Sequence, residues 1–187
     1  MRIALIGYRC SGKTVVGREL AARLGWKFVD TDSVIEKRAG KSVAKIFENE
    51  GDKVFRALER KAIKELADAT ECVIAAGGGA LGSRANVAAL KRQGKVIWLE
   101  TSAEELIRRA RADEKENVKR PPLTDMPLDE EIRATLEKRT PPYRAAADCI
   151  ISTDGYTSGE IVERVVSYLE LIGVIKPQGE QPHGGGI

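Results

Sequence analysis

The residues Gly7-Tyr8-Arg9-Cys10-Ser11-Gly12-Lys13-Thr14 follow an apolar run at 3–6 and lead into residues 15–24, whose apolar positions recur at helical spacing. This order of strand, G-x-x-x-x-G-K-[ST] loop and helix is the context that a phosphate-binding P-loop requires. Its glycines let backbone N–H groups curve around phosphate oxygens, and the start of a helix adds partial positive charge. The stretch predicts binding of a nucleoside triphosphate.

Within this loop each residue type has a chemical reason. The Lys13 ammonium can reach the β- and γ-phosphates, and the Thr14 hydroxyl can bind Mg²⁺. The other residues expected to contact ATP are Cys10, Ser11, Gly12 and Val15. The alternative is a glycine-rich turn that only joins a strand to a helix. The matching strand and helix on either side disfavour that alternative.

The composition argues for a single globular domain and against several kinds of partner. The chain has 187 residues, and its 31 basic and 28 acidic residues give a net charge of only +3. No long block of one charge occurs, which argues against nucleic-acid and membrane-surface binding. The apolar runs are too short to span a bilayer. We therefore expect no nucleic-acid or membrane partner; a monomer is a separate expectation that composition does not decide.

The cysteines and the N-terminus indicate a cytoplasmic protein. Three scattered cysteines, an odd number, predict thiols in a reducing compartment and neither disulfides nor a zinc site; they are Cys10, Cys72 and Cys149. The first predicted strand follows directly after Met1-Arg2, so we expect no signal peptide. The single histidine, His183, lies in a polar tail, so histidine-based catalysis is not expected.

Strand and helix patterns alternate along the chain. We predict strands at 3–6, 26–29, 72–76, 95–99 and 149–152, and helices at 15–24, 33–39, 42–49, 52–69, 83–93, 102–113, 128–138 and 157–171. The last two S/T-x-x-E patterns, at 102–105 and 157–160, predict capping boxes. Such alternation favours an α/β fold with a parallel sheet and helices on both faces. We expect one domain over 1–175, a mobile loop at 114–127 and a flexible tail at 176–187.

An acidic pair follows the second predicted strand. Ligands of parallel sheets bind at the carboxyl ends of strands, so Asp30 and Asp32 fall beside the P-loop. If the segment is extended, both carboxylates point the same way. One could support Mg²⁺ with Thr14, and the other could accept the proton of a hydroxyl that receives phosphate. A solvated turn with Asp32 as a helix cap is equally compatible with these residues alone.

Three further segments carry candidate residues. Arg56 and Glu59 are one helical turn apart, so they can pair and orient a guanidinium toward an acidic substrate, although most such pairs lie on surfaces. The glycines Gly77–Gly79 suggest close approach of backbone to a ligand, or a plain bend. Arg120, in the irregular segment, could close over the transferred phosphate or lie in a solvated loop.

Taken together and in this order, the motifs resemble the shikimate kinase family over roughly residues 1–172. They are Gly7–Thr14, Asp30-Thr31-Asp32, Phe55-Arg56-x-x-Glu59, Gly77–Gly79, Arg120-Pro121-Pro122-Leu123 and Arg139-Thr140-Pro141-Pro142-Tyr143. The resemblance implies a five-stranded parallel sheet of the nucleoside-monophosphate-kinase type, a substrate-binding region at about 32–61 and a lid at about 112–127. It implies ATP- and Mg²⁺-dependent phosphorylation of the 3-hydroxyl of shikimate, toward chorismate and aromatic amino acids.

The resemblance also assigns roles to residues. Asp32 would bind the shikimate hydroxyls and act as base or orienter, and Arg56 and Arg139 would hold the shikimate carboxylate. The substrate would also contact the backbone of Gly77, Gly78 and Gly79, above all Gly78. Asp30 would support Mg²⁺ with Thr14, while Lys13 and the lid residue Arg120 would act on the phosphates.

The chain departs from the family pattern at three places. Ala76 and Val15 stand where many members carry a residue with a hydroxyl group. The turn at 153–156 lacks the arginine that packs against adenine in some members. Arg111 or its neighbours would then serve the adenine. Two other functions stay open: transfer to gluconate or a nucleoside monophosphate, and a non-catalytic nucleotide switch. The paired arginines and Asp32 favour a small hydroxy acid as acceptor.

Overall fold

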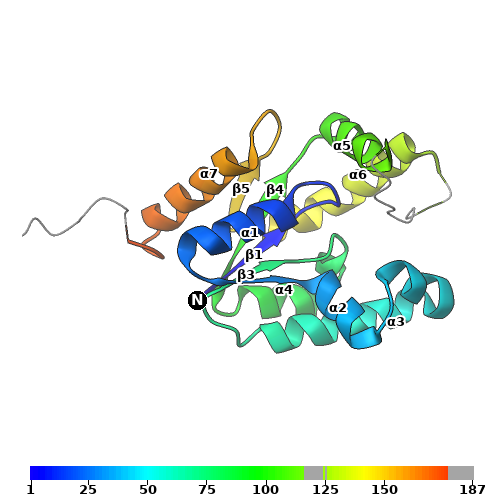
Figure 1. Cartoon of the computed structure of the whole chain (residues 1–187), viewed down its shortest axis with the longest axis horizontal. Helices are drawn as coiled ribbons and strands as arrows, with labels where there is room; N and C mark the ends of the chain where they lie inside the picture. The colour runs from blue at the N-terminus through cyan, green and yellow to red at the C-terminus, as the bar shows by residue number, and fades with distance from the viewer. Residues whose placement is uncertain (116–123, 125, 177–187) are drawn as a thin grey trace, which may run out of the picture.

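The computed structural model describes residues 1–115, 124 and 126–176, and it is built around one parallel sheet (Figure 1). Its strands are β1 (Arg2–Ile6), β2 (Lys27–Asp30), β3 (Cys72–Ala75), β4 (Gly94–Glu100) and β5 (Cys149–Ser152). They lie in the order β2-β3-β1-β4-β5, and every neighbouring pair is parallel. The predicted five-stranded α/β fold is confirmed.

Helices lie on both sides of this sheet (Figure 1). The α-helices of the described residues are α1 (Lys13–Leu24), α2 (Thr31–Ala39), α3 (Val43–Leu66), α4 (Arg84–Lys91), α5 (Ala103–Lys115), α6 (Leu128–Ala146) and α7 (Ser158–Leu171), and a short 3₁₀ helix covers Ala80–Gly82. The chain therefore returns through a helix between successive parallel strands, as such strands require.

Alternation along β1 creates two cores. Ile3 and Leu5 face one side of the sheet, whereas Ala4 and Ile6 face the other, because successive side chains of a strand point in opposite directions. The first pair packs in a core with α1 and α7, which supply Val16, Leu20, Val165 and Leu169. The second pair packs with residues of α3, α4 and α6, namely Ile63, Leu90, Tyr143 and Ala146. The result is a three-layer structure.

The sheet order brings the predicted motifs to one edge. β1 pairs with β3 on one side and with β4 on the other, and β2 pairs with β3 so that Asp30 lies opposite Ala75. The segments that follow β1, β2 and β3 therefore emerge at the same end of the sheet. These segments are the P-loop, the acidic pair and the glycine run.

The structure corrects the local geometry of the acidic pair. The prediction that Asp30-Thr31-Asp32 is extended was wrong, because α2 begins at Thr31. The Asp30 carboxylate caps this helix by accepting hydrogen bonds from the N–H groups of Asp32 and Ser33. Asp30 thus ends a strand, and Asp32 lies in the first helical turn.

One predicted helix boundary is confirmed and another changes. The predicted break at Gly51 between the helices at 42–49 and 52–69 is confirmed, because Gly51 has a non-helical φ of 80° and α3 therefore consists of two helices that meet at this kink. The predicted end of α6 at 138 was wrong, because the helix continues through Pro141 and Pro142 to Ala146. Tyr143 and Ala146 are buried against the sheet, and this packing outweighs the cost of the prolines.

One of the two predicted capping boxes is complete. Thr157 and Glu160 exchange both hydrogen bonds at the start of α7. At the start of α5, the Ser102 hydroxyl accepts from the Glu105 N–H, but the Ser102 N–H donates to Asp154. The Glu105 carboxylate instead binds two arginines of its own helix.

Other expectations concern the cysteines and the chain's irregular segments. The three cysteines, all within the described residues, form no disulfide. No helix in that part of the chain combines the length and the apolar character needed to cross a membrane. Residues 112–115 of the predicted lid belong to α5. The rest of the lid, except Thr124, Met126 and Pro127, lies outside the described residues, as do Arg120 and the tail from 177.

Close packing of α1 on the sheet gives a test of the fold. A Cβ atom at Gly17 would lie 2.5 Å from Cε2 of Phe28 and 3.3 Å from Cδ1 of Leu5. Gly17→Ala should therefore lower the free energy of unfolding by roughly 1–3 kcal/mol, although alanine is the better helix former. Urea unfolding followed by circular dichroism measures this change.

Gly159 provides a matched control for that substitution. It lies in the first turn of α7, is exposed and has no neighbour within 4 Å of an added Cβ. Gly159→Ala should leave stability unchanged or raise it by up to about 1 kcal/mol. Equal effects of the two substitutions would contradict the packing of α1 described above.

Candidate active site

The P-loop is curled by residues with positive φ. Gly7 has a φ of 147°, Cys10 of 65° and Gly12 of 91°. A Cβ at Gly7 would lie 2.7 Å from the Leu99 carbonyl oxygen, so only glycine fits there. Gly12 is the N-cap of α1, whose first residue is Lys13. The backbone thus forms a concave turn at a helix N-terminus, which is a site suited to phosphate.

Lys13 lies folded over this turn. Its ammonium donates hydrogen bonds to the carbonyl oxygens of Gly7 at 2.9 Å and Tyr8 at 2.6 Å. These contacts keep the positive charge beside the loop. The surrounding hollow, of about 350 Å³, is lined by most of the predicted ligands, among them Cys10, Gly12, Lys13, Thr14, Val15, Asp30, Asp32, Gly77 and Gly78.

Thr14 and Asp30 supply two oxygen atoms at one side of the loop. The Thr14 hydroxyl donates to Asp30 Oδ2 at 2.9 Å, while Asp30 Oδ1 caps α2. Hydroxyl and carboxylate oxygens are donors that Mg²⁺ accepts, and in kinase sites phosphates and water complete its shell. The residues therefore fit the predicted metal role.

Asp32 has the electrostatic environment expected of a proton acceptor. Burial, reinforced by the neighbouring Asp30 charge, raises its pKa from the usual 3.8 to about 6. Its Oδ1 is buried and accepts no hydrogen bond from any described residue. A Cβ at Gly77 would lie 2.8 Å from this oxygen, so the carboxylate lies directly against the glycine run.

Buried Glu59 pairs with half-buried Arg56 beside Asp32. Glu59 is 1% exposed, and its Oε2 accepts a hydrogen bond from Arg56 Nη1 at 3.1 Å. Its Oε1 has no partner within the described chain and would be 2.9 Å from a Cβ at Gly77. Burial raises the pKa of Glu59. The surface-pair alternative for Arg56 and Glu59 is therefore wrong.

The second predicted acceptor arginine approaches the same glycines from α6. A Cβ at Gly78 would lie 3.0 Å from Arg139 Nη1, and one at Gly79 would collide with the Arg56 guanidinium. The Tyr143 hydroxyl donates to the Gly78 carbonyl oxygen at 2.5 Å. A hollow of about 420 Å³ is lined by both arginines, Glu59, Gly78 and Gly79. Two cations thus flank a glycine backbone.

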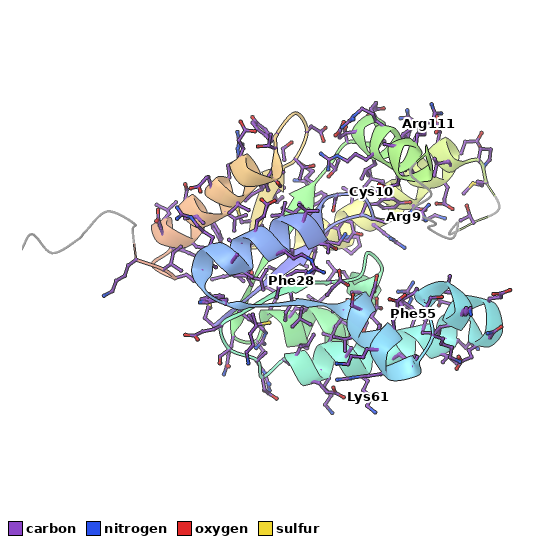
Figure 2. The ribbon with its side chains drawn as sticks, in the orientation of Figure 1. Arg9, Cys10, Phe28, Phe55, Lys61 and Arg111 are labelled. Atoms are coloured by element: carbon purple, nitrogen blue, oxygen red, sulfur yellow. The ribbon has the colours of Figure 1, made fainter. Side chains whose placement is uncertain are left out.

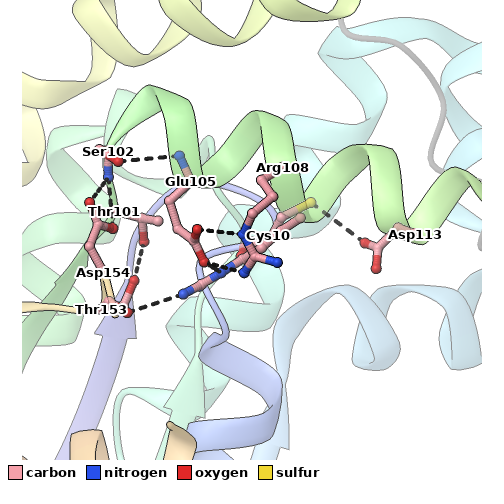
Figure 3. A network of polar contacts seen from close by, with 9 residues as sticks. Cys10, Thr101, Ser102, Glu105, Arg108, Asp113, Thr153 and Asp154 are labelled. Atoms are coloured by element: carbon pink, nitrogen blue, oxygen red, sulfur yellow. Dashed lines mark hydrogen bonds and ion pairs between the residues drawn. The ribbon is translucent and has the colours of Figure 1, made fainter. Parts of the chain in front are cut away.

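A network around α5 ties the P-loop to the segment before α7 (Figure 3). Arg109 donates to Glu105 at 2.7 Å, to the Cys10 carbonyl at 3.3 Å and to the Thr153 carbonyl at 3.1 Å. Hydrogen bonds from Arg108 and then Arg109 lower the pKa of Glu105 to about 2, against the opposing effect of burial. The network holds Arg109 beside the start of α1.

Sequence reasoning did not single out Arg108 and Arg109, which line a hollow of about 580 Å³ next to the P-loop. Its other lining residues include Ser11, Gly12, Val15, Tyr156 and Ile161. Arg111, named from the sequence, lies on α5 (Figure 2) and its guanidinium donates to Asp129 at 2.6 Å. It is not among the described lining residues of this hollow. The spacing of Glu105 to Arg108 and Arg109, three and four residues, could have indicated the pairing.

Arg9, which precedes Cys10 in the P-loop, was also not predicted from the sequence to be a functional residue. Figure 2 shows Arg9 beside Cys10, below α5. The Arg9 guanidinium donates to Oε1 of Glu131, which is 1% exposed on α6. Glu131 Oε2 accepts from the Thr124 N–H at 2.8 Å. This pair attaches the P-loop to the start of α6.

The raised pKa of Asp32 has a consequence for stability. An acid whose folded pKa lies above its unfolded pKa stabilises the fold below about pH 4 and loses that contribution as pH rises through about 6. From pH 4 to 8, wild type should lose roughly 1–3 kcal/mol more stability than Asp32→Asn, which cannot ionise there. Urea unfolding at pH 4, 6 and 8, without Mg²⁺ or nucleotide, measures the two slopes. If the free energy of unfolding changed equally with pH in the two proteins, Asp32 would ionise as easily in the folded protein as in the unfolded chain.

Comparison with known proteins agrees with this geometry. The family model for shikimate kinase matches residues 9–170. A shikimate kinase of Moorella thermoacetica is 42% identical over 174 residues, which cover 91% of this chain and 97% of that relative.

Solved structures give the same result. Shikimate kinase from Acinetobacter baumannii in complex with shikimate has a TM-score of 0.83 and 35% identity, with 94% of each chain covered. The enzyme from Aquifex aeolicus has a TM-score of 0.79 and 33% identity, covering 93% of this chain and 99% of that one. The chain belongs to the shikimate kinase family.

Proposed function

We propose that this enzyme transfers the γ-phosphoryl group of ATP to the 3-hydroxyl of shikimate in the presence of Mg²⁺, and so acts on the route to chorismate and the aromatic amino acids. Family membership supports the reaction. The observation that carries the acceptor's identity is the pair of guanidinium groups, Arg56 and Arg139, around the glycine run next to half-buried Asp32. A small acid with hydroxyl groups complements this charge pattern.

The nucleotide would lie along the P-loop. The N–H groups of the turn and the Lys13 ammonium would hold its phosphates, once Lys13 exchanges the carbonyls of Gly7 and Tyr8 for phosphate oxygens. The base would occupy the hollow lined by Arg108, Arg109 and Tyr156. Arg111 is not assigned an adenine contact in this proposal.

Thr14 and Asp30 would hold Mg²⁺ together with phosphate oxygens. Their oxygens are already adjacent, 2.9 Å apart, beside the phosphate-binding turn. The cation would neutralise negative charge on the phosphates during transfer. This metal role rests on the donor types and their location.

Shikimate would lie between the two arginines and Asp32. Its carboxylate would accept hydrogen bonds from Arg56 and Arg139, and the backbone of Gly77–Gly79 would lie against the ring. Asp32, near the P-loop side of the glycines, would accept hydrogen bonds from the hydroxyls. This orientation directs the 3-hydroxyl toward the terminal phosphate.

Asp32 would take the proton released by the reacting hydroxyl. The hydroxyl oxygen forms a bond to the γ-phosphorus, the bond from that phosphorus to the β,γ-bridging oxygen breaks, and the proton passes to Asp32. With a pKa of about 6, the carboxylate is ionised at neutral pH and more basic than an ordinary aspartate. Arg120, outside the described residues, keeps its predicted role of stabilising charge on the phosphates.

The remaining expectations form part of the same proposal. We propose a single catalytic domain over residues 1–175 that acts as a cytoplasmic monomer without nucleic-acid or membrane partners. The small net charge and the cysteines without disulfides support it.

Measurement of ADP release tests the reaction and its base together. Wild type with ATP and Mg²⁺ should respond to shikimate and not to gluconate or a nucleoside monophosphate. Asp32→Asn should lower kcat by roughly 10²–10⁴-fold, because the proton acceptor is lost. Its nucleotide affinity, measured by titration calorimetry, should change less than about two-fold, because Asp32 does not form part of the P-loop.

Each alternative outcome has a distinct meaning. Stimulation by another acceptor would overturn shikimate as the substrate. Absence of stimulation by any acceptor, with ATP still bound, would favour a nucleotide switch. Near-normal turnover by Asp32→Asn would remove this residue from the proton transfer.

Arg56 gives a separate prediction for acceptor binding. Arg56→Ala should weaken shikimate binding by about 10- to 100-fold, because a charge-assisted bidentate contact is lost, and should change ATP binding little. Arg38→Ala, at an exposed ion pair with Glu65, is the matched control and should alter neither affinity. A larger loss of ATP affinity than of shikimate affinity in Arg56→Ala would refute the carboxylate clamp.

A further inference from the structure

The two acceptor arginines are held in different ways. Arg56 donates to Asp52 and Glu59, both at 3.1 Å. Arg139 forms no ion pair with a carboxylate of the described residues. Its guanidinium instead lies over the ring of Tyr8, with 5.6 Å from the central carbon to the ring centroid. An aromatic ring of the P-loop thus takes the place that acidic side chains have around Arg56.

Tyr8 is itself firmly packed. Only 2% of it is exposed, and it belongs to a core cluster formed with α5 and α6. The buried members of that cluster are Leu106, Ile107, Ala110 and Ile132. Arg9 lies 5.9 Å from the same ring centroid and is anchored on buried Glu131. Because the ring cannot move independently of these helices, it provides a fixed surface.

A cation–π contact can hold a guanidinium without using its N–H donors. The face of the ring attracts the positive charge, and no donor has to form a hydrogen bond with the ring. An ion pair would orient the group but would use some of these donors. Arg139 also lies against the Gly78 backbone, where a Cβ would be 3.0 Å from Nη1. The Tyr8 ring, the Gly78 backbone and the Tyr143 hydroxyl, a polar contact of the guanidinium, together orient Arg139, and none of them is a carboxylate that would compete with a ligand carboxylate.

We propose that Tyr8 is a positioning residue for the acceptor: its ring holds the Arg139 guanidinium in the orientation that binds the shikimate carboxylate. This inference rests on the proposed function, in which Arg139 is one of two carboxylate ligands. It gives the P-loop a second role, since the residue after Gly7 acts on the acceptor and not on the nucleotide.

Substitution of Tyr8 tests the role of the ring. Tyr8→Phe retains the aromatic face and should keep the dissociation constant and KM for shikimate within about two-fold of wild type. Tyr8→Leu retains apolar volume without the face, and should raise both by roughly 3- to 30-fold. The affinity for ADP should change less than about two-fold in either variant. Titration calorimetry and initial rates measure these constants.

A double-mutant cycle separates an effect through Arg139 from a general disturbance. Tyr8→Leu should have little further effect on shikimate affinity in an Arg139→Ala background and its full effect in an Arg56→Ala background. Ile132→Ala removes packing from the same core cluster. It should lower the melting temperature without a selective rise in the KM for shikimate.

The outcomes distinguish this inference from the proposed function. Unchanged shikimate affinity in Arg139→Ala would remove Arg139 from the clamp and contradict the assigned acceptor site. A large effect of Arg139→Ala with none of Tyr8→Leu would leave that site intact and overturn the role of Tyr8. An undiminished effect of Tyr8→Leu in the Arg139→Ala background, or an equal loss of ADP affinity, would also overturn it.

Discussion

Parallel pairing of β1 with β3, and of β3 with β2, determines where the P-loop, the acidic pair and the glycine run lie. Parallel strands end at the same edge, so the segment after each strand enters one shared space. β1 leads to the phosphate-binding turn, β2 to Asp30 and Asp32, and β3 to the glycine run. The hydrogen-bond ladder therefore assembles three pieces that lie far apart in sequence. The helices then add the cations, with Arg56 from α3, Arg109 from α5 and Arg139 from α6.

The free-energy cost of burying carboxylates is greatest beside the glycine run, Gly77–Gly79. The carboxylates of Asp32 and Glu59 both approach Gly77, and each has a raised pKa because water is largely excluded. Arg56 compensates part of this cost by binding Glu59. Buried charges without full compensation reduce stability, yet they give a carboxylate the basicity that proton transfer requires. The glycine run thus combines close packing with an arrangement of charge that a more stable protein would avoid.

The sequence allowed the sheet, the P-loop and the acceptor motifs to be predicted, because these depend on local periodicity and on residue types in a fixed order. It misled where local and tertiary effects compete: the helix predicted to end at residue 138 continues through Pro141 and Pro142, because Tyr143 packs against the sheet. The cap formed by Asp30 could not be distinguished from an extended turn. The contacts of Tyr8 with Arg139, and of Arg109 with Cys10, join distant segments, so no spacing along the chain reveals them.

Close contact between Gly17 and Phe28 connects the packing of the core to the positions of Thr14 and Asp30. Gly17 lies one turn beyond Lys13 and Thr14 on α1, and Phe28 lies two residues before Asp30 on β2. The phosphate-binding turn and the carboxylate beside it are therefore attached to two elements that pack directly on each other, with Gly17 and Phe28 in close contact between them. Thermal loosening at this contact would separate Thr14 from Asp30 at the same moment. Heat inactivation and loss of core order would then be a single event, with no temperature interval in which a folded protein lacks the contact between Thr14 and Asp30.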